Sequence, residues 1–318
     1  MNFRSKTMLK LREFLKRYYI ILIIIAVALC IMLYVNRSFK KPQKEESVSK
    51  SNSISSPVID TTKEVPTEYK EPINNLIKNF MEYCNNKEYE SGYNLLSSDF
   101  KKRYISSLSK FKIYVDTVFK SKKIYNVQNY SNTNEIYVYS ITIMDDILAS
   151  GSTNGYNSIE DKFVITKENG EFKLALNGYC GSKEINVNSQ DKYMEIRIVK
   201  KYIKYDKETY LIQFKNMTNN YIVLADNTEK NEIILKTSSG SKQCDMTNAN
   251  LVILPNETVE KEITFDKYFD DGKEDENLIL NAIRILPEYS GKEENATKEK
   301  KKAVKLYSLT IDLKQNKQ

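Results

Sequence analysis

The sequence contains neither histidine nor tryptophan among its 318 residues. Histidine is the commonest general base near neutral pH and the commonest protein ligand of metals. Its absence excludes a Ser-His-Asp triad, a Cys-His pair and every zinc site that uses imidazole. The absence of tryptophan removes the Cys…Trp…Cys signature of true immunoglobulin domains. We therefore expect a protein that is not an enzyme and that holds no cofactor or metal.

Cysteine is scarce, and its spacing matches no metal or redox motif. Of the four cysteines, Cys30 lies in an apolar run, whereas Cys84, Cys180 and Cys244 follow that run. Three thiols cannot all pair within one chain, so we predict buried or unpaired cysteines. A disulfide between Cys84 and Cys180 stays an open alternative.

The positive charge is confined to one end of the sequence. The net charge is +7, but residues 1–50 hold eleven Lys and Arg against three acidic residues, so the rest of the chain carries −1. A nearly neutral remainder lacks the basic footprint of a nucleic-acid-binding protein. The basic flanks suit anionic membrane lipid instead. We predict lipid as a partner of this end and no nucleic acid as a partner.

Residues 18–35 form an apolar run of eighteen residues without a charge, with tyrosines at both ends. This length is at the lower limit for a helix that crosses a bilayer. The pattern predicts a basic cytoplasmic tail at 1–17 and one transmembrane helix at 18–35. A cleaved signal at Ala26 and Ala28, or a lipoprotein modified on Cys30, are alternatives. We expect a single-pass protein of the cell membrane with its later domains outside the cytoplasm.

The composition changes twice after the apolar run. Residues 36–69 are rich in Ser, Lys, Glu, Pro and Thr without apolar periodicity, which predicts a disordered linker. From residue 70 the spacing of apolar residues is helical, and Ser107 is a candidate N-cap. The period then falls to two, with Asn169-Gly170 as a hairpin signal. An α+β domain at 70–182 follows, and its helical face is predicted to hold Ile73, Leu76, Ile77, Phe80, Met81 and Cys84.

The stretch FMEYCNNKEYESGYNLLSSDFKKRY, Phe80–Tyr104, followed by a helix and long strands, resembles the nuclear-transport-factor-2-like family of bacterial extracytoplasmic domains. The resemblance implies a cone, in which helices pack on a bent antiparallel sheet. It further implies that Tyr89, Tyr93, Leu95 and Leu96 pack the second helix and that Phe100 closes the cone. Gly92 stands where alanine is expected in that helix.

Residues 190–314 repeat short strand-like runs separated by turn signals. This spacing predicts an all-β sandwich that resembles immunoglobulin-like bacterial surface domains in layout. The acidic run at 270–276 fails the spacing of a calcium loop and is expected to be an exposed loop. The predicted fold class is therefore multidomain: a transmembrane helix, an α+β cone-like domain and a C-terminal sandwich.

Two pairs of carboxylates are the only candidate ligand contacts in the predicted α+β domain. Asp145 and Asp146 end one predicted strand, and Glu160 and Asp161 begin another, so all four could line the mouth of a cone. Paired carboxylates at strand ends are more often solvated turn residues.

We expect a non-catalytic binding or scaffold protein of a bacterial envelope assembly, with protein partners there and with a homodimer left open. A cell-wall or carbohydrate-binding protein is the first alternative. An enzyme or small-ligand binder that uses the cone is the second, and it requires a buried carboxylate with a raised pKa.

Overall fold

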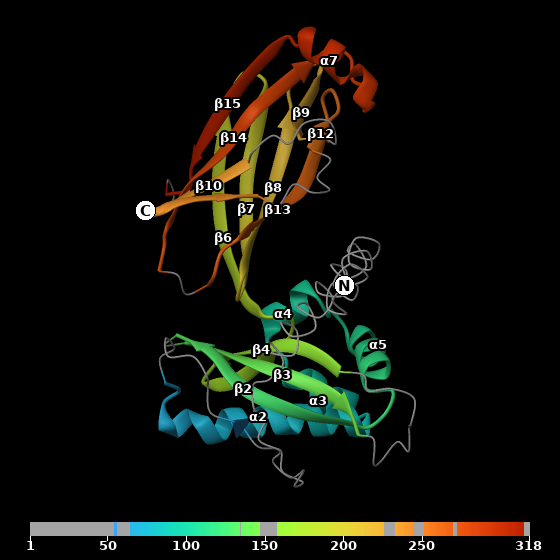
Figure 1. Ribbon diagram of the computed structural model, residues 1–318, viewed down its shortest axis with the longest axis vertical. Coiled ribbons are helices and arrows are strands. Elements are labelled where there is room, and N and C mark those ends of the chain that lie inside the picture. The colour runs from blue at the N-terminus through green and yellow to red at the C-terminus, as the bar shows by residue number, and fades with distance from the viewer. Residues whose placement is uncertain are drawn as a thin grey trace, which may run out of the picture. The chain divides into compact units, whose positions relative to one another are not determined.

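The computed structural model describes residues 54–55, 64–133, 135–146, 158–225, 233–244, 251–269 and 272–314 (Figure 1). The chain divides into two units, residues 1–51 and 52–318, and all described residues belong to the second. Within that unit the buried side chains form two separate hydrophobic clusters. Each cluster is described by itself below.

The first cluster contains a layer of four helices: α2 (Thr67–Asn86), α3 (Tyr89–Asn94), α4 (Ser98–Arg103) and α5 (Leu108–Val118). The buried face of α2 holds the six predicted residues Ile73, Leu76, Ile77, Phe80, Met81 and Cys84, which confirms that prediction. The helix ends at Lys87, which has a left-handed backbone (φ 62°). The hydroxyl of Ser107 accepts a hydrogen bond from the Lys110 N–H at the start of α5, as predicted for an N-cap.

The helices pack on a five-stranded sheet of order β1-β2-β3-β4-β5 (Figure 1). Phe80 of α2 contacts Phe163 of the sheet edge-to-face, with ring centroids 5.6 Å apart. The Asn169-Gly170 turn joins β4 and β5 with positive φ at both residues, as the sequence predicts. The strands are β1 (Ile54–Ser55), β2 (Lys123–Asn132), β3 (Ile136–Asp145), β4 (Ser158–Glu168) and β5 (Glu171–Ala175).

The second cluster is built from residues of two further sheets, which we call the sandwich. One sheet has the order β13-β8-β7-β6 and is antiparallel throughout. Its strands are β6 (Tyr179–Gln190), β7 (Met194–Lys204), β8 (Lys207–Asn216) and β13 (Thr258–Asp266). Alternate residues of β8 are buried, with Tyr210, Ile212 and Phe214 on the inner face.

The other sheet of the sandwich has the order β11-β10-β14-β9-β12, and β15 pairs with β14. Its central strand, β14, carries Leu278, Leu280, Ile283 and Ile285 into the second cluster. The strands are β9 (Tyr221–Ala225), β10 (Ile233–Thr237), β11 (Gly240–Gln243), β12 (Leu251–Ile253), β14 (Asp275–Leu286) and β15 (Lys305–Asp312).

The predicted fold class is wrong. Of the residues that the structure describes, 53% lie in strands and 23% in helices, and the predicted α+β cone is not supported. The reason is that, apart from α7 (Glu293–Lys301), the described helices are confined to residues 67–118. Three of the four helices there, α3, α4 and α5, have only 6, 6 and 11 residues, whereas every later long element but one is a strand.

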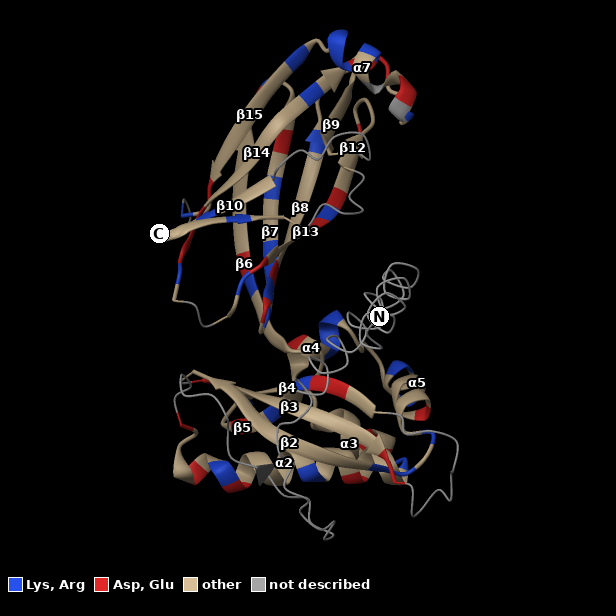
Figure 2. Cartoon of the chain, viewed as in Figure 1, with Lys and Arg blue, Asp and Glu red and all other residues tan. Residues whose placement is uncertain are grey.

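The predicted transmembrane helix is also not supported. No helix of the described residues combines the length and apolarity needed to cross a membrane. The segment on which that prediction rested, residues 18–35, lies outside the described residues, as do the basic tail at 1–17 and most of the linker at 36–69. The longest described helix, α2, has charged residues along its outer face, which Figure 2 shows as alternating red and blue.

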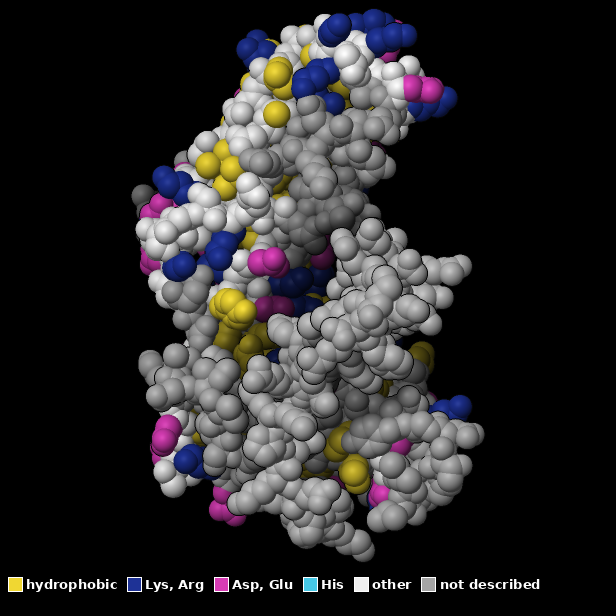
Figure 3. Space-filling model, in the orientation of Figure 1, with side chains coloured by type: hydrophobic (Ala, Val, Ile, Leu, Met, Phe, Trp, Pro, Cys, Tyr) yellow, Lys and Arg dark blue, Asp and Glu magenta, His cyan; other side chains and the backbone are white. Residues whose placement is uncertain are grey.

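Two elements differ from the sequence interpretation at the level of residues. Within the region predicted to contain only strands and turns, the mixed-charge residues 293–301 form the helix α7 (Glu293–Lys301). Basic side chains gather at the end of the sandwich that carries α7 (Figure 3), including Lys298, Lys300 and Lys301 of its last turn. Strand β6 also covers residues 183–189, which the predicted domains at 70–182 and 190–314 leave unassigned. Cys84 and Cys180 do not form a disulfide with each other, so that open alternative is not observed.

Candidate functional site

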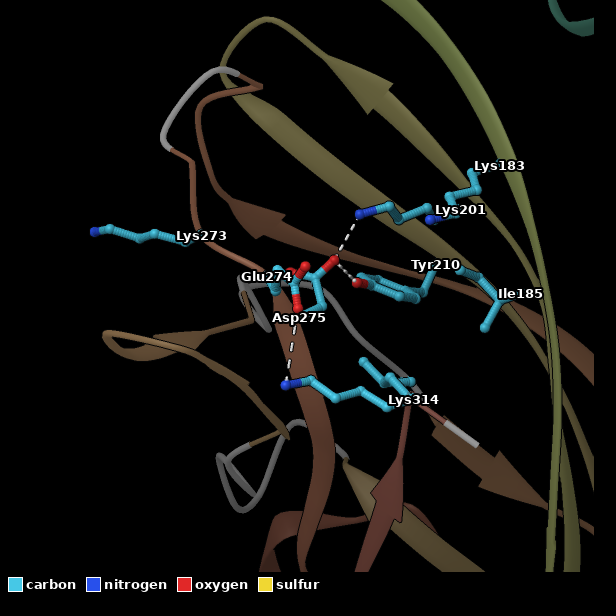
Figure 4. A pocket seen from close by; sticks show the side chains of 9 residues that line it. Lys183, Ile185, Lys201, Tyr210, Lys273, Glu274, Asp275 and Lys314 are labelled. Atoms are coloured by element: carbon cyan, nitrogen blue, oxygen red, sulfur yellow. Dashed lines mark hydrogen bonds and ion pairs between the residues drawn. The ribbon is translucent and has the colours of Figure 1, made fainter. Parts of the chain in front are cut away.

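A pocket of about 240 Å³ opens at one end of the sandwich (Figure 4). Five separate segments contribute to it, namely β6, β7, β8, the start of β14 and the residues after β15. Four of the lining side chains are cationic and two are anionic, so the lining has a formal charge of +2. The lining residues are Lys183, Ile185, Lys201, Tyr210, Lys273, Glu274, Asp275, Leu313 and Lys314.

The floor of the pocket contains Lys201 and Asp275, which form a closed ring with two charged side chains outside the lining, Glu208 and Lys267. Lys201 Nζ lies 3.0 Å from Glu208 Oε2 and 2.5 Å from Asp275 Oδ2. Lys267 Nζ lies 3.0 Å from Glu208 Oε1 and 2.9 Å from Asp275 Oδ1. None of the four side chains is more than 11% exposed. Each lysine thus bridges both carboxylates, and the ring has no net charge.

The hydroxyl of Tyr210 completes this ring, because it donates a hydrogen bond of 2.7 Å to Asp275 Oδ2. Figure 4 shows Lys201 and Tyr210 converging on the same carboxylate oxygen. We name Lys201, Glu208, Tyr210, Lys267 and Asp275 the ionic cluster. Buried charges are stable in proteins only when they are paired and hydrogen-bonded, and every member of this cluster meets that condition.

The protonation states follow from these contacts. Burial alone raises the pKa of Asp275, but Lys201, Lys267 and the Tyr210 hydroxyl outweigh it and hold that pKa below its usual value. Burial raises the pKa of Glu208 above its usual value, and Lys201 and Lys267 only partly offset this. Burial lowers the pKa of Lys267, but its two carboxylate partners raise it by more. Burial also raises the pKa of Tyr210 well above its usual value. At neutral pH Lys267 is therefore charged and the hydroxyl of Tyr210 is protonated.

The rim of the pocket differs from its floor. Lys183 of β6 stands directly opposite Lys201 of β7 in the strand register, so two like charges are neighbours. Within the part of the chain that the structure describes, Lys183 is exposed and makes no hydrogen bond or ion pair. Lys314 lies 3.2 Å from Glu276 and 3.9 Å from Glu274. Ile185 and Leu313 add apolar surface beside these cations.

The ionic cluster was missed in the sequence, although the alternation of residues carried a signal for it. Glu208 shares the inner face of β8 with Tyr210, and Lys267 follows Ile263 and Phe265 at the spacing of two. Glu208 thus occupies a buried position of β8, and Lys267 occupies the next buried position after β13. Two residues of opposite charge at buried positions of paired strands indicate an ion pair. Asp275 belongs to the acidic run at 270–276, which was expected to be an exposed loop, but it is only 10% exposed at the side chain.

The predicted pair Asp145 and Asp146 has a structural setting. Asp145 at the end of β3 lies 2.6 Å from Lys123 of the neighbouring strand and accepts a hydrogen bond from Ser121. The lysine and serine contacts lower the pKa of Asp145. The backbone N–H of Asp146 donates to the Lys122 carbonyl. Asp145 therefore helps to hold β2 against β3.

The second predicted pair lies in β4 and meets other partners. Glu160 is exposed and stands opposite Thr142 of β3. Asp161 is half-buried and accepts the backbone N–H groups of Lys162 and Asn177, at 2.6 and 2.8 Å. Burial raises the pKa of Asp161 to about 6. The two predicted pairs thus serve different contacts, and Asp161 joins β4 to the turn before β6.

Asp161 has the raised pKa that an enzyme using this sheet would require. Its position is nevertheless explained by the two backbone hydrogen bonds, since one carboxylate oxygen accepts both. Among the described residues, no group of three or more His, Cys, Asp or Glu side chains is arranged to hold a metal ion.

Comparison with known proteins adds no assignment to this geometry. No protein-family model matches the sequence. A search of curated proteins also returns no match. The resemblance of residues 80–104 to the nuclear-transport-factor-2-like family therefore stays a prediction.

Proposed function

We propose that this is a non-catalytic binding protein and that the pocket of the sandwich holds part of its partner. The observation that carries the proposal is the contrast between floor and rim. The charged side chains of the ionic cluster are all paired. Lys183 at the rim has no partner among the described residues, and it stands opposite another cation, Lys201. Pockets with a few convergent polar groups beside apolar walls are the usual form of a binding site.

The protonation states favour binding over chemistry. A lysine acts as a nucleophile or base only when it loses its proton, but the carboxylates raise the pKa of Lys267. The high pKa of Tyr210 keeps its hydroxyl protonated as a donor to Asp275. Asp275 is held as an anion between two lysines, so it is a poor proton acceptor. The ionic cluster is therefore better suited to form a rigid wall of a binding pocket than to take part in a reaction.

The sequence-based expectation of an envelope scaffold with protein partners fits such a pocket. The alternative of a carbohydrate-binding surface fits less well, because the aromatic side chain in the lining, Tyr210, is fully buried. Sugar recognition usually uses the exposed face of an aromatic ring. A protein partner is accordingly the first expectation for the occupant.

Site-directed photo-crosslinking in the native cell tests the proposal. A benzoylphenylalanine in place of Lys273 lies on the lining of the pocket, and the same residue in place of Ile113 gives a matched control on α5. Ile113 is 67% exposed and belongs to neither hydrophobic cluster. A discrete adduct from position 273 and not from position 113 supports the proposal. Equal adducts from both positions, or none from position 273, would contradict it.

A further inference from the structure

The pocket has the composition expected of a site for a carboxylate that is joined to an apolar group. We propose that it binds the C-terminal carboxylate of a peptide whose last side chain is apolar. This inference rests on the binding function proposed above and names the chemistry of the ligand. Lys183 and Lys201 are the carboxylate contacts, and Ile185 and Leu313 are the contacts of the apolar side chain.

The cations supply unused donors. A lysine ammonium has three N–H groups. Lys201 uses two of them on Glu208 and Asp275, so one N–H is left over on a side chain that lines the pocket. Lys183 has all three left, within the described part of the chain. An anion between the two lysines would accept these hydrogen bonds and offset the repulsion between two cations in register.

The charge balance favours a single negative charge on the occupant. The lining has a formal charge of +2, and the two anionic side chains Glu274 and Asp275 lie on the same wall as the start of β14. These carboxylates oppose a ligand of high negative charge that reaches across the pocket. A monoanionic carboxylate held at the Lys183 side stays away from Glu274, as Figure 4 shows for the placement of Lys183. The other carboxylate, Asp275, is already paired with Lys201, Lys267 and the Tyr210 hydroxyl.

The apolar walls favour a peptide over a free inorganic anion or a sugar acid. Ile185 and Leu313 would stay uncovered by phosphate, whereas an aliphatic side chain would bury them at about 25 cal/mol per Å². A sugar ring would bring several hydroxyl groups against these walls, and they offer no hydrogen-bond partner. A volume of about 240 Å³ suits one terminal residue.

The test is a binding series on the full-length chain, read by heteronuclear NMR with lysine and isoleucine labelling. The probes are N-acetyl-leucine, its amide, glucuronate and inorganic phosphate. We expect N-acetyl-leucine to shift the Ile185 and Lys183 signals, and its amide, which lacks the carboxylate, to leave them unchanged. High salt should weaken the binding, because the lysine at the rim is exposed to solvent.

Substitution identifies the site. Lys183→Gln should weaken the binding of N-acetyl-leucine about fivefold, a typical loss for one exposed ion pair. Lys305→Gln is the matched control, since Lys305 is also an exposed strand lysine but lies at the far end of β15 from the pocket. Neither lysine has a described ion pair, so both variants should fold. Equal binding by all three proteins would overturn the inference.

The probes also separate the sources of the anion. Binding of glucuronate or phosphate in preference to N-acetyl-leucine would overturn the peptide assignment. Adducts from position 273 in the cell without any binding of the four probes would refute the ligand class and leave the proposed function standing. The absence of both adducts and binding would refute the two proposals together.

Discussion

The ionic cluster predicts a large and asymmetric effect of mutation. Lys267→Met removes one cation from the buried ring and leaves Glu208 and Asp275 with Lys201 alone. Breaking a buried ion pair by removing one partner typically costs about 3–5 kcal/mol, because the remaining charge is left uncompensated. We therefore expect the free energy of unfolding of Lys267→Met to fall by that amount at pH 7.

The double variant Lys267→Met, Glu208→Gln restores neutrality, since one lysine and one aspartate remain. It should recover about 1–3 kcal/mol of the loss relative to Lys267→Met alone. The control is Lys207→Met, which removes a lysine whose pair with Asp266 is solvent-exposed and 3.8 Å long. A change within about 0.5 kcal/mol is expected there.

Urea unfolding followed by far-ultraviolet circular dichroism measures all four proteins, with tyrosine fluorescence as a second probe because the sequence has no tryptophan. The pH dependence gives an independent check. In Lys267→Met, Glu208 loses one of the two lysines that lower its pKa, so its folded pKa, which burial already raises, rises further above the unfolded value. Stability of this variant should accordingly increase as the pH falls from 8 to 5. A loss below about 1 kcal/mol, or a double variant no better than the single one, would refute the reasoning.

Two further predictions concern the first hydrophobic cluster and the turn beside it. The pKa of Asp161, raised by burial to about 6, lies above its unfolded value, so stability is greatest below the unfolded pKa and falls as the pH rises through 6. Asp161→Asn should remove this slope from a plot of melting temperature against pH; an unchanged slope would show that another group titrates. Gly178→Ala should cost about 2 kcal/mol or more, because φ is +66° and the new Cβ would lie 2.3 Å from the Tyr205 ring. Gly170→Ala, at φ +86° with nothing within 4 Å, should cost about 1 kcal/mol in the same urea assay, and equal losses would rule out the clash.

Local patterns in the sequence predicted the elements better than the fold class. The buried face of α2 followed from spacing alone, because a long amphipathic helix repeats its signal over several turns. The strands of the sandwich followed from alternation and turns in the same way. The relative amounts of helix and strand did not follow, because three of the four N-terminal helices are too short to dominate.

The candidate site was harder to predict than the strands that form it. Lys201, Glu208 and Asp275 come from three strands, and only the register of the sheets brings them together. A β-bulge between Ile198 and Lys200 also shifts the alternation of β7, so Lys201 turns inward against the simple pattern. Asp145 and Asp161 were singled out because the sequence placed them at strand ends. Asp145 does end β3, whereas Asp161 lies inside β4.

Strand β6 has a consequence for how the chain can be divided. Tyr179 and Cys180 at its start belong to the first hydrophobic cluster, whereas Val187 belongs to the second. Its pairing with β7 extends from Tyr179 to Gln190, with register shifts at Tyr179–Gly181 and Glu184–Val187. Among the described residues, the two clusters are thus joined by a paired strand. A truncation or domain swap that cuts the chain within β6 would interrupt this strand. We therefore expect that neither cluster folds as a separate domain.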